Sequence, residues 1–289
     1  MSAAYPDDLR QLVDTELESL GFSQESATAG LEEAMRYSLL AGGKRVRPVL
    51  VLATARALGA DPAGFLKVAC AIELIHTYSL IHDDLPAMDD DDLRRGQPTS
   101  HVKFGEDVAI LAGDGLFAEA IRIFCEQPGE PARVLAALRE LAAATGVGGM
   151  VGGQYLDILG EARDAEALRG LHALKTGRLI EAGVGVVLVL EGLGEPETMP
   201  YRRFAGELGV LFQIVDDILD VTGSAEQLGK PSGSDERHGK LTYVSLFGLE
   251  RARELAAESR AKAIEALDEA KGETRHLRQI ADYIFTRNE

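Results

Sequence analysis

The chain has 289 residues, of which 46% are hydrophobic, so it can bury one large core or two smaller ones. Tryptophan is absent and aromatic residues account for only 6%, whereas residues that favour helices are abundant, which predicts a mostly helical protein. The formal net charge of -17 excludes a broad nucleic-acid-binding surface, because phosphate backbones are bound by clustered lysine and arginine.

Apolar residues recur every three or four positions through most of the chain, which predicts helices rather than strands. The expected helices cover residues 9–20, 31–40, 46–58, 65–81, 108–124, 134–144, 150–159, 165–190, 199–221, 241–269 and 274–287. Turns rich in glycine or proline separate them at 42–43, 59–64, 96–98, 127–131, 192–200 and 229–239. None of these turns is long enough for an interdomain linker, so the sequence predicts one all-α domain over residues 1–289.

The first twenty residues and the apolar stretches bear on location. Residues 1–20 contain no basic region followed by an apolar one, so we expect no secretory signal and a cytoplasmic protein. The nearest approach to a membrane span, 182–190, is too short to cross a bilayer, so we expect no spanning segment. Cys70 and Cys125 both lie in apolar helical patterns and are expected to be buried free thiols.

The first acidic cluster directly follows the expected helix 65–81, and places six acidic residues within positions 83–92. A run of like charges is usually a solvated surface, but here a strongly apolar helix leads into it. Asp83 and Asp89 are six positions apart and would not share a face of a continuous helix. Pro86 is expected to bend or end the helix, so that the chain returns Asp89 toward Asp83.

The second acidic cluster lies in an apolar helical window, with the sequence QIVDDILD at 213–220. Asp216 and Asp220 are four positions apart and share a helix face, where like charges destabilise an isolated helix. Divalent cations relieve such crowding, and Mg²⁺ typically takes one or two carboxylates together with phosphate oxygens and water. Two such clusters predict a shared site for several metal ions and a phosphorylated ligand.

Basic residues complement the acidic clusters. They are Lys44, Arg45 and Arg47 after a Gly-Gly turn, Arg94 and Arg95 after the first cluster, Lys175, Lys230 and Lys240. Each one alone would be read as a solvated surface charge. Together with the acidic clusters they predict one anionic substrate bridged by metal and a second held by lysine and arginine directly. The Gly-Gly turn is not a Walker loop, because the GxxxxGK[ST] spacing is absent.

Several sequence pieces occur together in a characteristic order. They are GGKRVRP at 42–48, IHDDLPAMDDDDLRRGQPTSH at 81–101, GGQYLDI at 152–158, KTGRLI at 175–180, FQIVDDILD at 212–220, and the LGK and GKLTY pieces that end at Lys230 and Tyr243. With them the chain resembles the trans-isoprenyl diphosphate synthase family, most closely the bacterial farnesyl diphosphate synthases. The resemblance implies a single-domain helical bundle around a deep central cavity, usually a homodimer. It also implies a reaction that joins isopentenyl diphosphate to a short allylic diphosphate with three Mg²⁺ ions.

The resemblance further implies a role for each matching position. The metal ligands would be Asp83, Asp84 and Asp89 in the first cluster and Asp216, Asp217 and Asp220 in the second. The allylic diphosphate would be held by Arg94, Lys175, Lys230 and Lys240, and isopentenyl diphosphate by Lys44, Arg47, His76 and Arg95. Thr176, Gln213 and the Lys175 carbonyl would stabilise the allylic carbocation as dipoles. For His76 and Gln154, a hydrogen-bonded core side chain is an equally good interpretation.

The residues before Asp83 bear on product length. Tyr78 and Ser79 precede Asp83 by five and four positions, so they lie about one helical turn, ~5.4 Å, deeper than the metal site. In the family, an aromatic residue here, with a two-residue expansion of the first motif, accompanies a fifteen-carbon product. Tyr78 is therefore the expected floor and farnesyl diphosphate the expected product.

Other functions remain open from the sequence. They are a geranyl or geranylgeranyl diphosphate synthase, a class I terpene cyclase, a non-catalytic subunit of a heteromeric prenyl synthase, and an acidic helical scaffold. The second DDxxD sequence and the basic residues on the isopentenyl side disfavour a cyclase, and non-catalytic subunits usually lack one aspartate motif. For a scaffold, the alternation of acidic and basic motifs at these spacings would be a coincidence.

Overall fold

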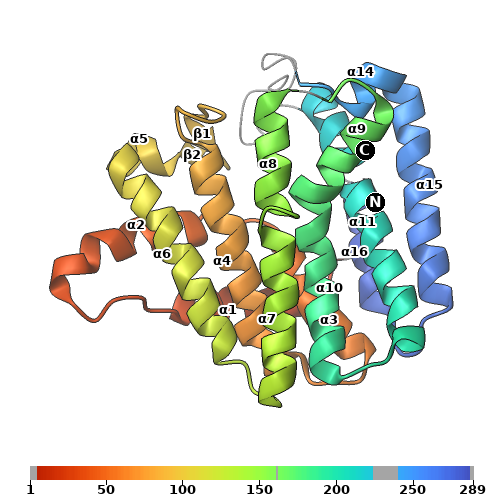
Figure 1. Ribbon diagram of the computed structural model, residues 1–289, viewed down its shortest axis with the longest axis horizontal. Helices are drawn as coiled ribbons and strands as arrows, with labels where there is room; N and C mark the ends of the chain where they lie inside the picture. Colours follow the sequence, from red (N-terminus) through yellow and green to blue (C-terminus); the bar gives the residue numbers. More distant parts are fainter. Residues whose placement is uncertain (1–4, 161, 224–239, 287–289) are drawn as a thin grey trace.

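The computed structural model describes residues 5–160, 162–223 and 240–286, and this part is almost entirely helical, as predicted (Figure 1). The α-helices are α1 (Asp7–Ser19), α2 (Ala29–Leu39), α3 (Val46–Ala57), α4 (Leu66–Asp83), α5 (Ser100–Phe104), α6 (Glu106–Cys125), α7 (Pro131–Thr145), α8 (Met150–Leu159), α9 (Ala165–His172), α10 (Arg178–Glu191), α11 (Glu195–Thr222), α14 (Tyr243–Phe247), α15 (Leu249–Asp268) and α16 (Arg275–Thr286). The 3₁₀ turns are η1 (Ser26–Thr28) and η2 (Pro62–Phe65), and a π-helical turn, η3 (Ala173–Gly177), joins α9 to α10.

The structure differs from the predicted elements in several places. The expected turn at 192–200 is helical from Glu195 onward, where α11 begins, and the expected helix 165–190 contains the π-helical turn η3. The expected turn at 229–239 lies outside the described residues. Strands β1 (Leu93–Arg94) and β2 (Gln97–Pro98) form a short hairpin, because Arg95 and Gly96 both have positive φ angles, 53° and 75°, that suit a tight two-residue turn. The short helix α5 was not expected. The single window 241–269 is divided into α14 and α15 at Gly248, whose φ of 79° cannot continue a right-handed helix.

Helix α4 lies in the core and packs against α3 and α6 (Figure 1). Its side chains are apolar around the whole circumference from Val68 to Ile75, apart from Glu73, as expected of a helix enclosed by neighbours. Helix α10 packs against α3, α7 and α11, and α11 packs in turn against α15 and α16. This arrangement brings the ends of α4, α8 and α11, together with η3 and α14, to the end of the bundle that carries the hairpin (Figure 1).

The Gly-Gly turn before α3 positions two basic residues, Lys44 and Arg45, differently. Gly42 and Gly43 have φ angles of 83° and 117°, and Arg45 has a left-handed φ of 52°. Arg45 is only 5% exposed and donates to Glu73 of α4 at 2.7 Å, so it belongs to a core ion pair. A buried charge that loses its partner is strongly destabilising, so this pair ties the start of α3 to α4. Lys44 is exposed.

Two stretches of helical backbone, Pro62–Asp83 and Pro131–Leu159, are long and apolar enough to cross a membrane by length and composition alone. Of the most apolar window, 61% is buried inside the protein in the first stretch and 33% in the second. The first contains the core helix α4, and the second contains α7 and α8. That no segment spans a membrane stays a prediction.

The two cysteines are free, as expected. Cys70 on α4 is buried, but the expected burial of Cys125 was wrong, because this last residue of α6 is exposed.

Candidate active site

The first acidic cluster folds back on itself after α4. The helix ends at Asp83, three residues before Pro86, and the backbone N–H of Asp89 donates to the carbonyl of Asp83 at 2.8 Å. Asp90 completes the return with a φ of 52°. The prediction that the chain would end its helix near Pro86 and bring Asp89 back to Asp83 is confirmed.

The charges in this loop favour a bound cation. Burial raises the pKa of Asp83 to about 6; the charge of Lys175 opposes this rise, and that of Asp89 adds to it. Among residues 5–160, 162–223 and 240–286, no three His, Cys, Asp or Glu side chains are grouped closely enough to hold a metal alone. Because Mg²⁺ takes one or two carboxylates and completes its shell with phosphate oxygens and water, Asp83 and Asp89 fit a magnesium site shared with a diphosphate.

Asp84 and Arg94 form an ion pair with each other. Both carboxylate oxygens of Asp84 accept from Nε of Arg94 at 2.8 Å, and the Asp84 residue is only 3% exposed. Because Arg94 lies on β1, the pair attaches the hairpin to the end of α4. Direct roles for Asp84 at the metal and for Arg94 at the diphosphate stay predictions; here each is the partner of the other.

Two predicted diphosphate ligands meet at one acidic residue that received no role from the sequence. Lys175 Nζ donates to Oδ2 of Asp157 at 2.6 Å, and Lys240 Nζ lies 3.1 Å from the same oxygen. Lys240 also donates to Oδ1 of Asp89 at 3.1 Å. Lys240 thus connects the segment before α14 with both α8 and the first acidic cluster. The signal for Asp157 was its position as the single charged residue of α8.

The π-helical turn η3 carries Lys175 and Thr176 and is closely approached from two sides. A Cβ added at Gly153 of α8 would lie 2.2 Å from the backbone nitrogen of Lys175, and one at Gly209 of α11 would lie 2.9 Å from Cα of Gly177. Only glycine permits these contacts. The two helices therefore set the position of the π turn, a conformation often found at functional sites.

A chain of hydrogen bonds connects η3 to the second acidic cluster. Thr176 Oγ1 donates to the Gln213 side-chain oxygen at 3.0 Å, and Gln213 Nε2 donates to Oδ1 of Asp217 at 2.9 Å. The backbone N–H of Tyr243 donates to Oδ2 of Asp217 at 2.8 Å. The structure thus brings together Thr176 and Gln213, the side chains expected near the carbocation.

The three aspartates of the second cluster differ in exposure. Asp216 is exposed, whereas Asp217 is 2% exposed and Asp220 is 7% exposed. Asp216 is therefore the most accessible of the three to a ligand, and Asp217 has a structural role between α11 and α14. Lys230 lies outside the described residues.

The residues expected to hold isopentenyl diphosphate lie on α3, on α4, in the hairpin and in the turn before α3. Arg47 Nη1 donates to Nε2 of His76 across 3.3 Å. Burial and the charge of Arg47 hold the pKa of His76 well below its usual value, so the ring is neutral. The Arg95 side chain lies against Gly43, where a Cβ would be 2.8 Å from its guanidinium carbon, and donates to the Gly42 carbonyl. The hairpin thereby places Arg95 beside the turn that carries Lys44.

For Gln154 of α8, the sequence supports a core role and a substrate role equally. It is 8% exposed, and within the described residues neither atom of its side-chain amide has a hydrogen-bond partner. Because buried amides are normally paired, the described residues do not supply the partner that a core glutamine would need.

Aromatic side chains surround the predicted chain-length position. The ring of Tyr78 packs edge-on against Phe117 of α6 at a centroid distance of 5.3 Å, and against His82 at 5.8 Å. Burial, with the charge of Asp83, raises the pKa of Tyr78 to about 12, so the ring is neutral. The neighbouring Ser79 hydroxyl donates to the His76 carbonyl at 2.9 Å and so lies against its own helix.

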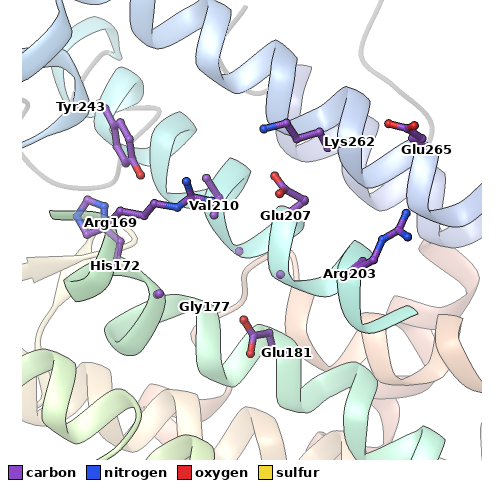
Figure 2. Close-up of a pocket in the computed structure, with 13 residues that line it drawn as sticks. Arg169, His172, Gly177, Glu181, Arg203, Glu207, Val210, Tyr243, Lys262 and Glu265 are labelled. Carbon is purple, nitrogen blue, oxygen red and sulfur yellow. The ribbon is translucent and has the colours of Figure 1, made fainter. Parts of the chain in front are cut away.

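A cavity of about 580 Å³ lies behind η3, between α9, α10, α11 and α15 (Figure 2). Its charged lining residues are Arg169, Glu181, Arg203, Glu207, Lys262 and Glu265. His172 and Tyr243 close one end with their rings 5.6 Å apart, and burial lowers the pKa of His172 to about 4. Neither this cavity nor a smaller one beside Arg94 is lined by Asp83 or Asp216, so the deep central cavity stays a prediction.

Related sequences cover nearly the whole chain. The polyprenyl synthetase profile matches residues 28–284. The farnesyl diphosphate synthase of Geobacillus stearothermophilus is 48% identical over 256 residues, which cover 87% of this chain and 86% of the relative. The chloroplastic geranylgeranyl pyrophosphate synthase of Capsicum annuum is also 48% identical, over 266 residues that cover 89% and 72% of the two chains.

Solved structures have the same fold. The geranyltransferase of Helicobacter pylori, complexed with magnesium and isoprenyl diphosphate, superposes with a TM-score of 0.87 at 33% identity, covering 99% of this chain and 98% of that one. An FPP/GFPP synthase from Zymomonas mobilis superposes with a TM-score of 0.85 at 37% identity, covering 96% of each chain. The predicted all-α fold of the isoprenoid synthase type is confirmed.

Proposed function

The chain belongs to the polyprenyl synthetase family and is a short-chain trans-prenyl diphosphate synthase, and we propose that its main product is farnesyl diphosphate. The substrates would be isopentenyl diphosphate and the allylic dimethylallyl and geranyl diphosphates. The observation that supports this reaction is the meeting of five sequence motifs at one end of the bundle. There Lys240 contacts Asp89 and Asp157, and Thr176 contacts Gln213.

The allylic diphosphate would bind between the two aspartate clusters. Three Mg²⁺ ions, held by Asp83, Asp89 and Asp216, would supply positive charge to the departing diphosphate. Lys175 and Lys240 would donate to its oxygens as the allylic C–O bond breaks. The Thr176 and Gln213 side chains would then stabilise the carbocation with their oxygen dipoles.

Isopentenyl diphosphate must keep its own diphosphate, so its site needs cations without metal. Lys44, Arg47 and Arg95 would hold it by direct charge-assisted hydrogen bonds. The neutral His76 would add a hydrogen bond without adding charge. The alkene of isopentenyl diphosphate attacks the carbocation, and loss of one proton to the released diphosphate gives a product one isoprene unit longer.

The product length rests on the two aromatic rings below Asp83. Tyr78 would block the growing chain, and Phe117 of α6 would support the Tyr78 ring from behind at 5.3 Å. The relatives carry names for both fifteen- and twenty-carbon products, which makes the geranylgeranyl product the alternative.

An assay with purified protein, Mg²⁺, isopentenyl diphosphate and dimethylallyl diphosphate tests this function. After dephosphorylation, the alcohols are identified by chromatography and mass, and we expect mainly farnesol. Geraniol or geranylgeraniol would contradict only the chain length. No prenyl alcohol from any allylic primer would contradict catalysis and favour a non-catalytic subunit.

We also propose that the protein is a homodimer that associates through helices α6, α7 and α8. Large apolar side chains that are 38–86% exposed gather on these adjacent helices and on the turn between α7 and α8, and we call them the α6–α8 apolar face: Ile110, Leu111, Phe117, Ile121, Leu135, Val147, Val151, Tyr155, Ile158 and Leu159. An exposed apolar patch of this kind favours association.

A charge in the middle of the α6–α8 apolar face should separate the subunits. Light scattering after size exclusion is expected to give twice the 31.0 kDa chain mass for the unmodified protein and a monomer for Leu111→Asp. Leu111 is 54% exposed. Met199→Asp, on the similarly exposed start of α11, serves as the control and should stay dimeric. A dimeric Leu111→Asp variant would place the contact elsewhere.

A further inference from the structure

Asp157 near the end of α8 holds two lysines with one carboxylate oxygen. Its side chain is 13% exposed, and Oδ2 lies 2.6 Å from Lys175 Nζ and 3.1 Å from Lys240 Nζ. Although burial opposes it, the two lysines hold the pKa of Asp157 below its usual value, so the carboxylate is ionised. The proposed reaction assigns no step to Asp157.

In the described part of the chain, these lysines also interact with two proposed magnesium ligands. Lys240 already donates to Asp89 at 3.1 Å, and the charge of Lys175 already acts on Asp83. A partly buried charge that is left without a partner is destabilising, so pairing with a nearby opposite charge is favoured. If the Asp157 carboxylate were lost, both ammonium groups would therefore turn further toward the first acidic cluster and compete there with Mg²⁺.

We propose that Asp157 is a positioning residue whose carboxylate holds two lysine ammonium groups, and so keeps them from pairing with the carboxylates of Asp83 and Asp89. The inference rests on the proposed function, because it assumes that these carboxylates bind Mg²⁺. When a diphosphate binds, its oxygens replace Asp157 as the partners of both lysines, so loss of Asp157 should act on metal binding more than on the step that breaks the C–O bond.

The backbone around Asp157 supports a fixed position. Gly153 lies one helical turn earlier on the same face of α8, and it contacts the backbone of Lys175 so closely that no Cβ fits. Because α8 is fixed against η3 at this point, Asp157 faces Lys175 directly. The ion pair is therefore built on two rigid elements, whereas Asp89 lies in a loop.

The test replaces Asp157 with asparagine, which keeps the shape and removes the charge. Binding of Mn²⁺, in place of Mg²⁺, is followed by electron paramagnetic resonance in the presence of the unreactive thiolo analogue of dimethylallyl diphosphate. We expect Asp157→Asn to raise the Mn²⁺ concentration at half saturation about tenfold. In kinetics the Mg²⁺ concentration for half-maximal rate should rise similarly, while kcat at saturating Mg²⁺ falls less than about threefold.

Two further variants make the result specific. Asp282→Asn removes an acid from an ion pair with Arg260 that joins α16 to α15, and should leave Mn²⁺ binding within about twofold. Asp157→Glu retains the charge and should shift Mn²⁺ binding less than Asp157→Asn. A shift as large as that of Asp157→Asn would overturn the proposal, because it would show that the charge of the carboxylate does not protect the metal site. If Asp157→Asn does not fold, Asp157→Ser takes its place, and an unchanged Mn²⁺ affinity in that variant would overturn the proposal.

Other results separate this proposal from the proposed function. Unchanged Mn²⁺ binding in folded Asp157→Asn would overturn the proposal, because Asp157 would then form only a structural ion pair. A large loss of kcat that excess Mg²⁺ does not restore would also overturn the positioning role. An unmodified protein that binds Mn²⁺ with the analogue but makes no prenyl product would instead contradict the proposed function alone.

Discussion

Asp83→Ala and Asp216→Ala are each expected to lower kcat by about two to three orders of magnitude while the protein stays folded. Each change removes a carboxylate proposed to hold Mg²⁺ against the departing diphosphate, so the charge that develops as the C–O bond breaks is less stabilised. Rates are measured at saturating substrates over a range of Mg²⁺ concentrations. Near-normal activity in either variant would refute its role at the metal.

For Asp83 the effect on stability should have the opposite sign to the effect on activity. The pKa of Asp83 is raised to about 6, mainly by burial, which means that folding disfavours its ionised form. This cost is present above about pH 6 and absent below the unfolded pKa of about 4. At pH 7 we therefore expect Asp83→Ala to have an equal or higher Tm. Asp268→Ala, which removes an exposed carboxylate paired with Arg278, controls for loss of charge and should keep normal activity.

Tyr78→Ala is expected to change the main product from fifteen to twenty carbons or more, with turnover retained. The Tyr78 ring lies about one turn below Asp83, and its removal would open space where a growing chain descends. Products are identified as alcohols by chromatography and mass. An unchanged chain length would show that the floor lies elsewhere.

Phe117 distinguishes a single blocking ring from a paired one. If Phe117 supports the Tyr78 ring, Phe117→Ala should give a mixture of fifteen- and twenty-carbon products, and the double variant should extend the product beyond Tyr78→Ala alone. Phe247→Ala removes a partly exposed ring from α14 and should leave the product unchanged. If Phe117→Ala changes the product neither alone nor together with Tyr78→Ala, the floor is formed by Tyr78 and by residues of other helices.

The helices could be predicted because each buries an apolar stripe with a period near 3.6, and the window 150–159 coincides with α8. The return of Asp89 followed from the local chemistry of Pro86. Contacts between residues that are far apart in the sequence produce no periodic pattern in the sequence. Arg45 is 28 positions from Glu73, and Lys240 is 151 positions from Asp89, so their partners depend on how helices pack. For the same reason the sequence grouped Arg45 with Lys44, although only Lys44 is exposed.

The π-helical turn changes how one long apolar pattern is used. From the sequence, residues 165–190 form one uninterrupted window, but η3 adds a wider turn in its middle. In a regular helix each residue advances by about 100°, so one residue accommodated in a wider turn rotates everything after it by about that angle. The apolar pattern of residues 165–190 is thus divided: the side of α9 that carries His172 faces the cavity, and a side of α10 at a different angle faces the core. Deletion of one residue in η3 would leave a continuous helix but would rotate α10 relative to α9 by about 100°. Lys175 and Thr176 could then face the site only if α10 lost its present packing.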